Sequence, residues 1–168
     1  MPTQIQKITP FLWFNSEAEA AAAFYTAVFP DSRIIASTRY SAEGAEASGR
    51  PAGTVMTVSF VLAGQEFVAL NGGPYFSFTE AISFVVNCAT QDEVDYYWAR
   101  LAAGGDERAQ QCGWLKDRYG VSWQIVPTVL TVLLGDPDAA RARRAMKAML
   151  QMKKIDIAAL LRAADGVE

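Results

Sequence analysis

The sequence runs through one pattern of elements twice, and this repeat limits the possible folds more than any other feature. An apolar run, a helix-start signal and an amphipathic helix occupy residues 6–28, and the same order returns in residues 81–101. The aromatic pair Phe24-Tyr25 recurs as Tyr97-Trp98, an offset of 73 residues from 24 to 97. A duplicated unit of this kind usually needs a second copy to bury its apolar face.

Each copy is expected to hold one helix and four strands. The helices show apolar residues at i, i+3, i+4 and i+7, and each follows a capping box, Ser16 to Glu19 in the first copy and Thr90 to Glu93 in the second. The predicted strands are 6–14, 33–40, 54–62 and 65–71 in the first copy, and 81–88, 106–111, 112–116 and 121–126 in the second. Residues 41–53 are predicted to be a loop, and Ala63-Gly64 a tight turn. The pattern predicts an α+β fold of two tandem βαβββ modules.

The remaining residues are predicted to be helical. We expect one domain over residues 1–168, with module one at 5–74, module two at 75–127 and a C-terminal helical extension at 128–165. Asp136 is the expected N-cap of a helix at 137–152, and Asp156 that of the last helix. A Met-rich stripe on these helices fits core packing, with a ligand groove as the alternative. The basic residues fit a solvated helix face, with a phosphate-binding patch as the alternative.

Composition excludes several classes of function. The chain has no histidine, so the commonest metal ligand and the usual general base near neutral pH are missing. It has 168 residues and a net charge of -3. This charge argues against nucleic-acid binding, and no apolar run approaches the roughly 20 residues of a membrane span. Cys88 and Cys112 fit neither a disulfide framework nor a metal motif. We expect a cytoplasmic protein with no cofactor, no nucleic-acid partner and no membrane partner.

The most informative stretch is the hairpin CGWLKDRYGVSWQIVP at residues 112–127. Its last strand carries one polar residue that is predicted to point inward, Gln124. Cys112 is either a reactive thiol beside Lys116 or Arg118, or a buried inert one, and burial is favoured. Aromatic side chains near the strands fit either core packing or stacking on a flat ligand. The candidate pocket residues are Trp13, Asn71, Tyr75, Phe78, Trp114 and Gln124.

Several segments together resemble a known family. They are the ITPFLWF opening, LNGGPYFSFTEAISF at residues 70–84, the 112–127 hairpin and the MLQMKKIDIAAL tail at 149–160. With the duplicated modules, they are similar to the PhnB-like branch of the vicinal oxygen chelate superfamily, which includes glyoxalases and bleomycin-resistance proteins. The resemblance implies a glyoxalase-like pair of half-barrels. Members of this branch are often labelled 3-demethylubiquinone methyltransferase-like.

The resemblance also implies positions for a metal, because metal-dependent relatives draw ligands from the first and last strands of each module. These positions fall near Thr9 or Pro10, at Ala69 or Asn71, at Ala81 and at Gln124. Most of these residues are weak or impossible ligands, so we predict no metal. Glu66 and Glu80 are the nearest carboxylates, and both are expected to be surface or hydrogen-bonding residues.

Two functions remain open at this point. The favoured one is a metal-free small-molecule binding protein, a homodimer whose ligand is unknown. The alternative is an enzyme on a small oxygen-rich or aromatic substrate. A methyltransferase using S-adenosylmethionine ordinarily has a glycine-rich turn after its first strand, and Phe14-Asn15-Ser16 offers none.

Overall fold

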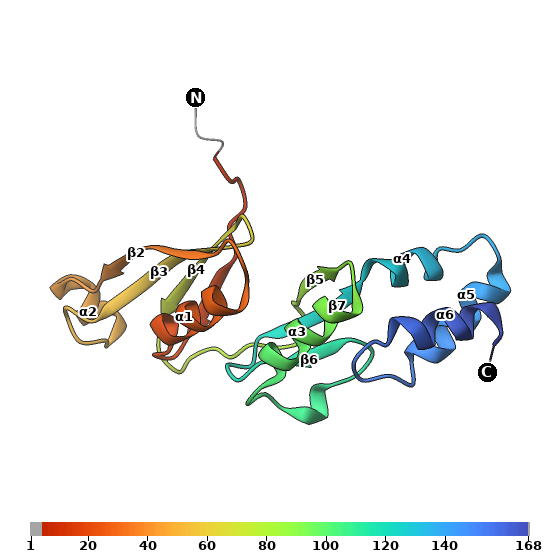
Figure 1. Cartoon of the computed structure of the whole chain (residues 1–168). Coiled ribbons are helices and arrows are strands. Elements are labelled where there is room, and N and C mark those ends of the chain that lie inside the picture. The colour runs from red at the N-terminus through yellow and green to blue at the C-terminus, as the bar shows by residue number, and fades with distance from the viewer. Residues whose placement is uncertain (1–4, 168) are drawn as a thin grey trace. The chain divides into compact units, whose positions relative to one another are not determined.

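The first half of the chain forms a four-stranded sheet with one helix along a face (Figure 1). The computed structural model describes residues 5–167. Its elements are β1 (Phe11–Phe14), α1 (Ala18–Val28), β2 (Arg33–Arg39), α2 (Ala42–Ser48), β3 (Val55–Leu62) and β4 (Gln65–Asn71). The strand order is β1-β4-β3-β2, with β1 parallel to β4 and the other pairs antiparallel. The unit ends at Phe78.

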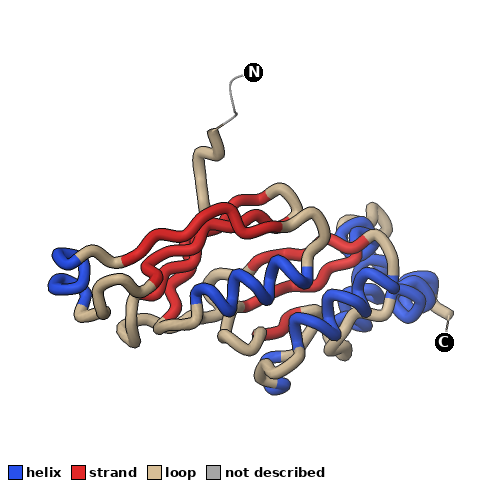
Figure 2. Tube along the Cα trace, turned by 60° about the vertical axis from the view of Figure 1, so that its left-hand side comes forward, coloured by secondary structure: helices blue, strands red, loops and turns tan. Residues whose placement is uncertain are grey.

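The second unit begins at Thr79 and repeats the plan with fewer strands. Its elements are β5 (Phe84–Cys88), α3 (Gln91–Ala102), the 3₁₀-helix η1 (Glu107–Ala109), β6 (Trp114–Lys116) and β7 (Ser122–Pro127). The strand order is β5-β7-β6. Three helices follow: α4 (Thr128–Leu134), α5 (Ala139–Met149) and α6 (Ile157–Asp165), seen as the blue coils near the C-terminus in Figure 2.

Each sheet buries its helix-facing side. In the first unit, Ala21 and Ala22 of α1 are fully buried, and such small side chains allow the helix to approach the sheet closely. Tyr25 lies parallel to Phe60, with ring centroids 6.3 Å apart, and Phe60 stacks on Phe67 at 5.6 Å. In the C-terminal extension, α4, α5 and α6 share a small core. Its buried residues are Leu130, Leu133, Ala145, Ile155, Leu160 and Ala164. The predicted α+β class, with two sheets and C-terminal helices, is confirmed.

The strand predicted at 106–111 is wrong. The Asp106 side chain accepts a hydrogen bond from the Arg108 amide at 3.0 Å, which favours a local turn, and the chain forms η1 instead. Only Gln111 pairs with the sheet, through a single bridge to Trp114. Cys112 and Gly113 have φ values of 52° and 85°, so they form a tight turn, and β6 begins at Trp114. The second sheet therefore lacks an outer fourth strand.

The loop predicted at 41–53 contains a short helix, α2. The Ser41 hydroxyl accepts a hydrogen bond from the Gly44 amide, and Gly49 ends the helix with a φ of 70°. Ser41 and Gly49 are therefore cap signals that the alanine- and glycine-rich composition of the segment obscured. None of the seven residues of α2 is buried.

Two predicted helix caps are also wrong. Ser16 does not cap α1; the Ala18 amide donates instead to the side chain of Asn71, 53 residues away, at 2.8 Å. The N-cap of α5 is Asp138 and not Asp136. Asp136 accepts the Asp138 amide and pairs with Arg141. The caps at Thr90 and Asp156 are confirmed.

Candidate functional site

The sheet of the second unit has one face against α3 and one face opposite it. Phe84, Val86 and Cys88 alternate along β5 with Val85 and Asn87, and the first three are the more buried. Neighbouring residues in register point to the same face of a sheet. Since Val85 is opposite Gln124, and Gln124 is opposite Trp114, these three side chains share the face opposite α3.

The register continues this row to the edge of the sheet. Gln111 bridges Trp114, so the row across the second unit is Val85, Gln124, Trp114 and Gln111. It combines an exposed aliphatic side chain, a half-buried indole and two primary amides. Such a row offers an apolar surface with polar groups at fixed positions, which is the usual composition of a small-molecule site.

Two residues of the segment before β5 reach the same face. The Gln124 Nε2 donates a hydrogen bond to Ser83 Oγ at 2.9 Å. Glu80 forms an ion pair with Lys116 at 2.5 Å, and this pairing keeps the pKa of Glu80 below its ordinary value of 4.5. Glu80 is therefore an anion near neutral pH, and its charge is balanced by Lys116.

An open pocket of about 330 Å³ lies at this edge of the sheet. It lies where the outer fourth strand is missing, because η1 and the single bridge at Gln111 replace that strand. The shortened sheet therefore leaves room beside Trp114. The pocket is lined by Glu80, Ala109, Gln111, Cys112 and Trp114.

Several polar groups on this face have no protein partner. Within residues 5–167, no acceptor is found for the Trp114 indole N–H and no donor for Gln124 Oε1. The Ser122 hydroxyl, which shares the face with Lys116 by register, is buried and also lacks a partner in the described chain. A buried hydroxyl without a partner is unfavourable, so this face has unused hydrogen-bonding capacity.

The hairpin that carries Trp114 and Gln124 is fixed by one buried carboxylate. Asp117 is 2% exposed and accepts hydrogen bonds from the Tyr119 and Val121 amides at 2.8 and 3.0 Å. Its second oxygen accepts the Trp123 indole N–H at 2.9 Å. These bonds hold the turn between β6 and β7 to one geometry, so they also set the positions of the two site residues.

The other predicted site residues lie in the first unit. Trp13 is on the face opposite α1, in a row with Leu70, Thr57 and Thr38. Its indole N–H donates to the Gly73 carbonyl at 2.8 Å, and its ring meets Phe76 edge-on. Gly72 must be glycine, because a Cβ there would lie 2.3 Å from the Trp13 ring.

Asn71 faces the start of α1 and is 3% exposed. Its oxygen accepts the Ala18 amide, and its nitrogen donates to Glu19 at 2.7 Å and to the Val55 carbonyl at 3.1 Å. Its side-chain amide is thus committed to the protein.

The last two candidates follow Asn71. Tyr75 is 72% exposed, and Phe78 packs edge-on against Phe14 at 5.2 Å. Of the six predicted residues, the structure brings Trp114 and Gln124 together as partners within the second unit.

Sequence reasoning missed Gln111, Ser83 and Ala109 as site residues. Gln111 fell inside a predicted strand, although the Cys112-Gly113 turn marks the end of that strand. The prediction that Cys112 is buried is wrong, since it is half-buried and lines the pocket. Cys88 is fully buried, and burial raises the pKa of its thiol to about 11. Cys88 is therefore a protonated, inert core residue.

The residues at the family's metal positions do not fit a metal ion. Ala69 and Ala81 have no donor atom, and Ala69 is fully buried against α1. The oxygen of Asn71 accepts the Ala18 amide and that of Thr9 accepts a hydrogen bond from Gln6, which leaves Gln124 Oε1 as the one uncommitted side-chain oxygen at these positions in the described chain. Among residues 5–167, no three His, Cys, Asp or Glu side chains come together as a metal site would require.

Comparison with known proteins gives one family. Residues 6–126 match the family described as 3-demethylubiquinone-9 3-methyltransferase. A PhnB protein from Bacillus cereus that carries the same description is 38% identical, covers 73% of this chain and 100% of its own, and superimposes with a TM-score of 0.61. No curated protein matches the chain.

More distant structures share the fold. The protein PA1353 from Pseudomonas aeruginosa is 21% identical and covers 73% of this chain and 98% of its own, with a TM-score of 0.55. The fosfomycin resistance protein FosX from Mesorhizobium loti is 14% identical and covers 80% of this chain and 100% of its own, with a TM-score of 0.53. In the described part of the chain, no helix is long and apolar enough to cross a membrane.

Proposed function

The chain belongs to the PhnB-like family described as 3-demethylubiquinone-9 3-methyltransferase, within the vicinal oxygen chelate superfamily, and on that premise we propose that it binds a small molecule beside Trp114 without a metal. The observation that carries this proposal is the pocket of about 330 Å³ at the edge of the second sheet. Its volume lies in the range of small-ligand sites, at their lower end. The face that continues from the pocket carries the Trp114 N–H and Gln124 Oε1, neither of which has a partner among residues 5–167.

The lining favours a flat ligand that carries hydroxyl groups. The Trp114 ring offers an apolar surface on which an aromatic ring can stack. Within the lining, the Gln111 amide can both donate and accept hydrogen bonds. Outside the lining, Gln124 lies next to Trp114 on the same face, where its Oε1 can accept a hydrogen bond from a ligand hydroxyl. The ion pair of Glu80 and Lys116 adds no net charge at the rim, which favours a neutral ligand. Together with the indole ring and the two amides, this makes a neutral hydroxylated aromatic of one ring the proposed ligand class.

The structural observations favour binding over acid-base catalysis. A general acid or base near neutral pH requires a carboxyl group whose pKa is raised toward 7. Glu80 is the carboxylate of the pocket, and its hydrogen bond with Lys116 shifts its pKa in the opposite direction. The two other polar side chains of the lining, Gln111 and Cys112, supply an amide and a thiol.

The family description does not transfer to this chain as an activity. A methyltransferase of the usual kind binds S-adenosylmethionine at a glycine-rich turn between the first strand and helix of a parallel sheet. Here β1 leads to α1 through Asn15, Ser16 and Glu17, and the sheet is antiparallel except for the β1–β4 pair. Because Asn15, Ser16 and Glu17 form no glycine-rich turn, the connection between β1 and α1 argues against methyl transfer and favours the binding role.

A titration with catechol tests the proposal, with tryptophan fluorescence as the readout. Wild-type protein and Trp98→Phe should show a saturable change, whereas Trp114→Phe should lose most of it. Trp98 lies on α3 and is the matched control. A saturable change that survives in Trp114→Phe would place the ligand elsewhere. No saturable change in the wild type up to millimolar catechol, together with no co-purified molecule in native mass spectrometry, would contradict the proposed function.

We also propose that the protein is a homodimer, as expected from the sequence. Support comes from apolar side chains on the first unit's edge strand β2, where Ile34 and Ile35 are 47% and 46% exposed. Exposed aliphatic groups on an edge strand favour pairing with another chain. Sedimentation equilibrium measures the mass, and a monomer at micromolar concentration would overturn this proposal.

A further inference from the structure

We infer that the C-terminal extension, residues 128–167, fixes the shape of the Trp114 pocket by holding the turn at Cys112-Gly113. This inference rests on the proposed function, because it concerns the same pocket. Two walls of the pocket, Gln111 and Trp114, are the residues on either side of that turn. Whatever fixes the turn therefore fixes the distance between these walls.

The turn itself is an unfavourable conformation for the chain. Gln111 and Trp114 exchange two backbone hydrogen bonds, of 3.1 and 2.8 Å, across the two central residues. Cys112 has a φ of 52°, a left-handed conformation that costs a residue with a side chain about 1 kcal/mol or more. The bridge at Gln111 is isolated, so strand pairing beyond it does not compensate for this cost. On the sheet side, the Ile125 amide of β7 donates to the Gly113 carbonyl at 2.8 Å, which leaves the Cys112 and Gly113 amides to be satisfied.

The extension supplies the missing contacts. The Cys112 amide donates to the Met152 carbonyl, and the Gly113 amide donates to the Lys153 carbonyl, both at 2.8 Å. In a two-residue hairpin turn that is not covered, these amides would face solvent. A Cβ on Gly113 would lie 3.2 Å from the Ile155 side chain, so the extension also packs directly on the turn.

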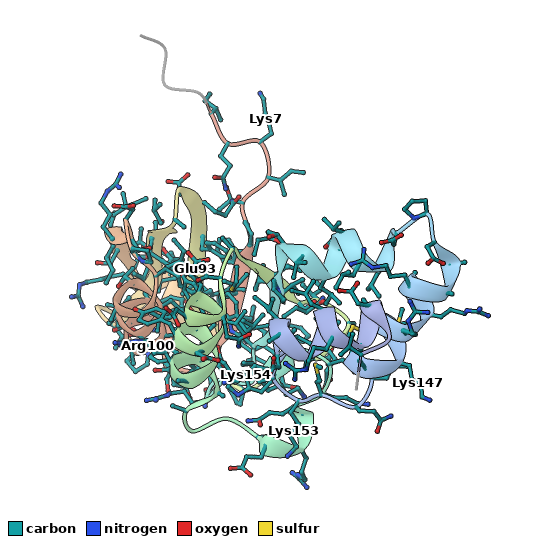
Figure 3. The ribbon with its side chains drawn as sticks, turned by 45° about the vertical axis from the view of Figure 1, so that its right-hand side comes forward. Lys7, Glu93, Arg100, Lys147, Lys153 and Lys154 are labelled. Carbon is teal, nitrogen blue, oxygen red and sulfur yellow. The ribbon has the colours of Figure 1, made fainter. Side chains whose placement is uncertain are left out.

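Helix α3 holds this part of the extension in place. The Gln91 side chain donates to the Ile155 carbonyl at 3.1 Å and accepts the Ile157 amide at 2.9 Å. One helical turn further on, Asp95 pairs with Lys154 at 2.5 Å, and Figure 3 shows Lys154 beside α3. Residues 152–157 are thus fixed on one side by α3 and in turn fix the hairpin on the other.

The extension has a small core of its own and lies beyond the residues that match the family model. Ile155 belongs to the small core shared by α4, α5 and α6. The family match ends at residue 126, and the whole Bacillus cereus protein corresponds to 73% of this chain. The Met152 and Lys153 carbonyls therefore act on the turn of the pocket from beyond the residues that match the family model.

Hydrogen exchange on the full chain tests the inference. The variant Gln91→Ala/Asp95→Ala removes both anchors on α3. Gln151→Ala is the control, because its exposed side chain makes no hydrogen bond within residues 5–167. The anchors contribute three side-chain contacts, so the Cys112 and Gly113 amides should exchange about tenfold faster in the double variant. In Gln151→Ala they should exchange as in the wild type, and the amides of β7 should stay protected in both.

Saturating catechol provides the second readout. A ligand that binds the closed turn should slow exchange of the Cys112 and Gly113 amides in the wild type. Unchanged exchange of these amides in the double variant would overturn the inference, and so would an equal rise throughout the second unit. Catechol that binds by fluorescence but leaves these amides unaffected would overturn it as well, with the proposed function intact. Faster turn exchange in the double variant, together with no catechol binding to the wild type, would overturn the proposed function and leave the contact between the extension and the turn standing.

Discussion

Trp114 and Gln124 lie directly opposite each other on β6 and β7, on the face opposite α3. One N–H of the Gln124 amide is donated to Ser83, and the oxygen of the same amide accepts no hydrogen bond within residues 5–167. The arrangement pairs an aromatic surface with one acceptor. It arises from a two-strand hairpin whose turn is fixed by Asp117.

The two cysteines should differ strongly in reactivity. Cys112 lines the pocket, whereas Cys88 is fully buried with a thiol pKa of about 11. At pH 8 only about a thousandth of a thiol with that pKa is ionised, and the thiolate is the reactive form. Iodoacetamide should therefore label Cys112 alone, as read by peptide mass spectrometry. Comparable labelling of Cys88 in folded Cys112→Ser protein would contradict the assignment.

Asn71 should be the most stabilising asparagine of the chain. Asn71→Ala removes the acceptor for the Ala18 amide and two donated hydrogen bonds, one of them to the Glu19 carboxylate. We expect a loss of about 2–4 kcal/mol in the free energy of unfolding. The control is Asn87→Ala, at an exposed strand position, which should cost below about 1 kcal/mol. Urea denaturation measures both, and equal effects would contradict the role of Asn71.

Gly105 should not tolerate a side chain. A Cβ at this position would lie 1.9 Å from the carbonyl oxygen of Lys116, so Gly105→Ala forces the backbone apart at the outer edge of β6. We expect a destabilisation of about 2 kcal/mol or more. Gly135→Ala is the control, because its Cβ would lie 3.4 Å from the nearest atom. Thermal unfolding that ranks the two variants equally would argue against this close approach.

The Asp95–Lys154 pair should weaken in acid. The hydrogen bond from Lys154 lowers the pKa of Asp95 below its ordinary value of 3.8. A carboxyl group whose pKa is lowered on folding stabilises the fold above its unfolded value, and this contribution is lost as the pH falls through the folded value. Carboxyl ¹³C NMR should show Asp95 titrating below 3.8, and Lys154→Ala should move its pKa upward. An unchanged pKa in Lys154→Ala would refute the coupling.

The repeat and the helix faces could be predicted because they depend on local sequence. The stripes of α1 and α3, the Ala63-Gly64 turn and the caps at Thr90 and Asp156 all depend on residues within a few positions of one another. The cap of α1 could not be predicted, because the Ala18 amide donates to Asn71, 53 residues further along the chain, and not to Ser16. Only tertiary packing brings these two segments together.

The candidate site was predictable in part for the same reason. Trp114 and Gln124 lie in one hairpin, so alternation along its two strands predicts that they share a face. The pocket depends on a strand that fails to form, since the Asp106 side chain competes for the Arg108 amide. Met152 and Lys153 contact the Cys112-Gly113 turn through their backbone carbonyls. Every residue has this group, so residue type does not predict the contact. Ligand identity likewise depends on side chains that converge only in the folded unit.

An NMR titration with catechol tests the central claim most directly. The chain has four tryptophans, whose indole N–H signals are resolved in a ¹H–¹⁵N spectrum and assigned with single Trp→Phe variants. We predict that catechol shifts the Trp114 indole signal and the side-chain amide signals of Gln124 and Gln111 most strongly. Shifts centred on Trp13 or Trp98, with the Trp114 signal unmoved at saturation, would contradict it.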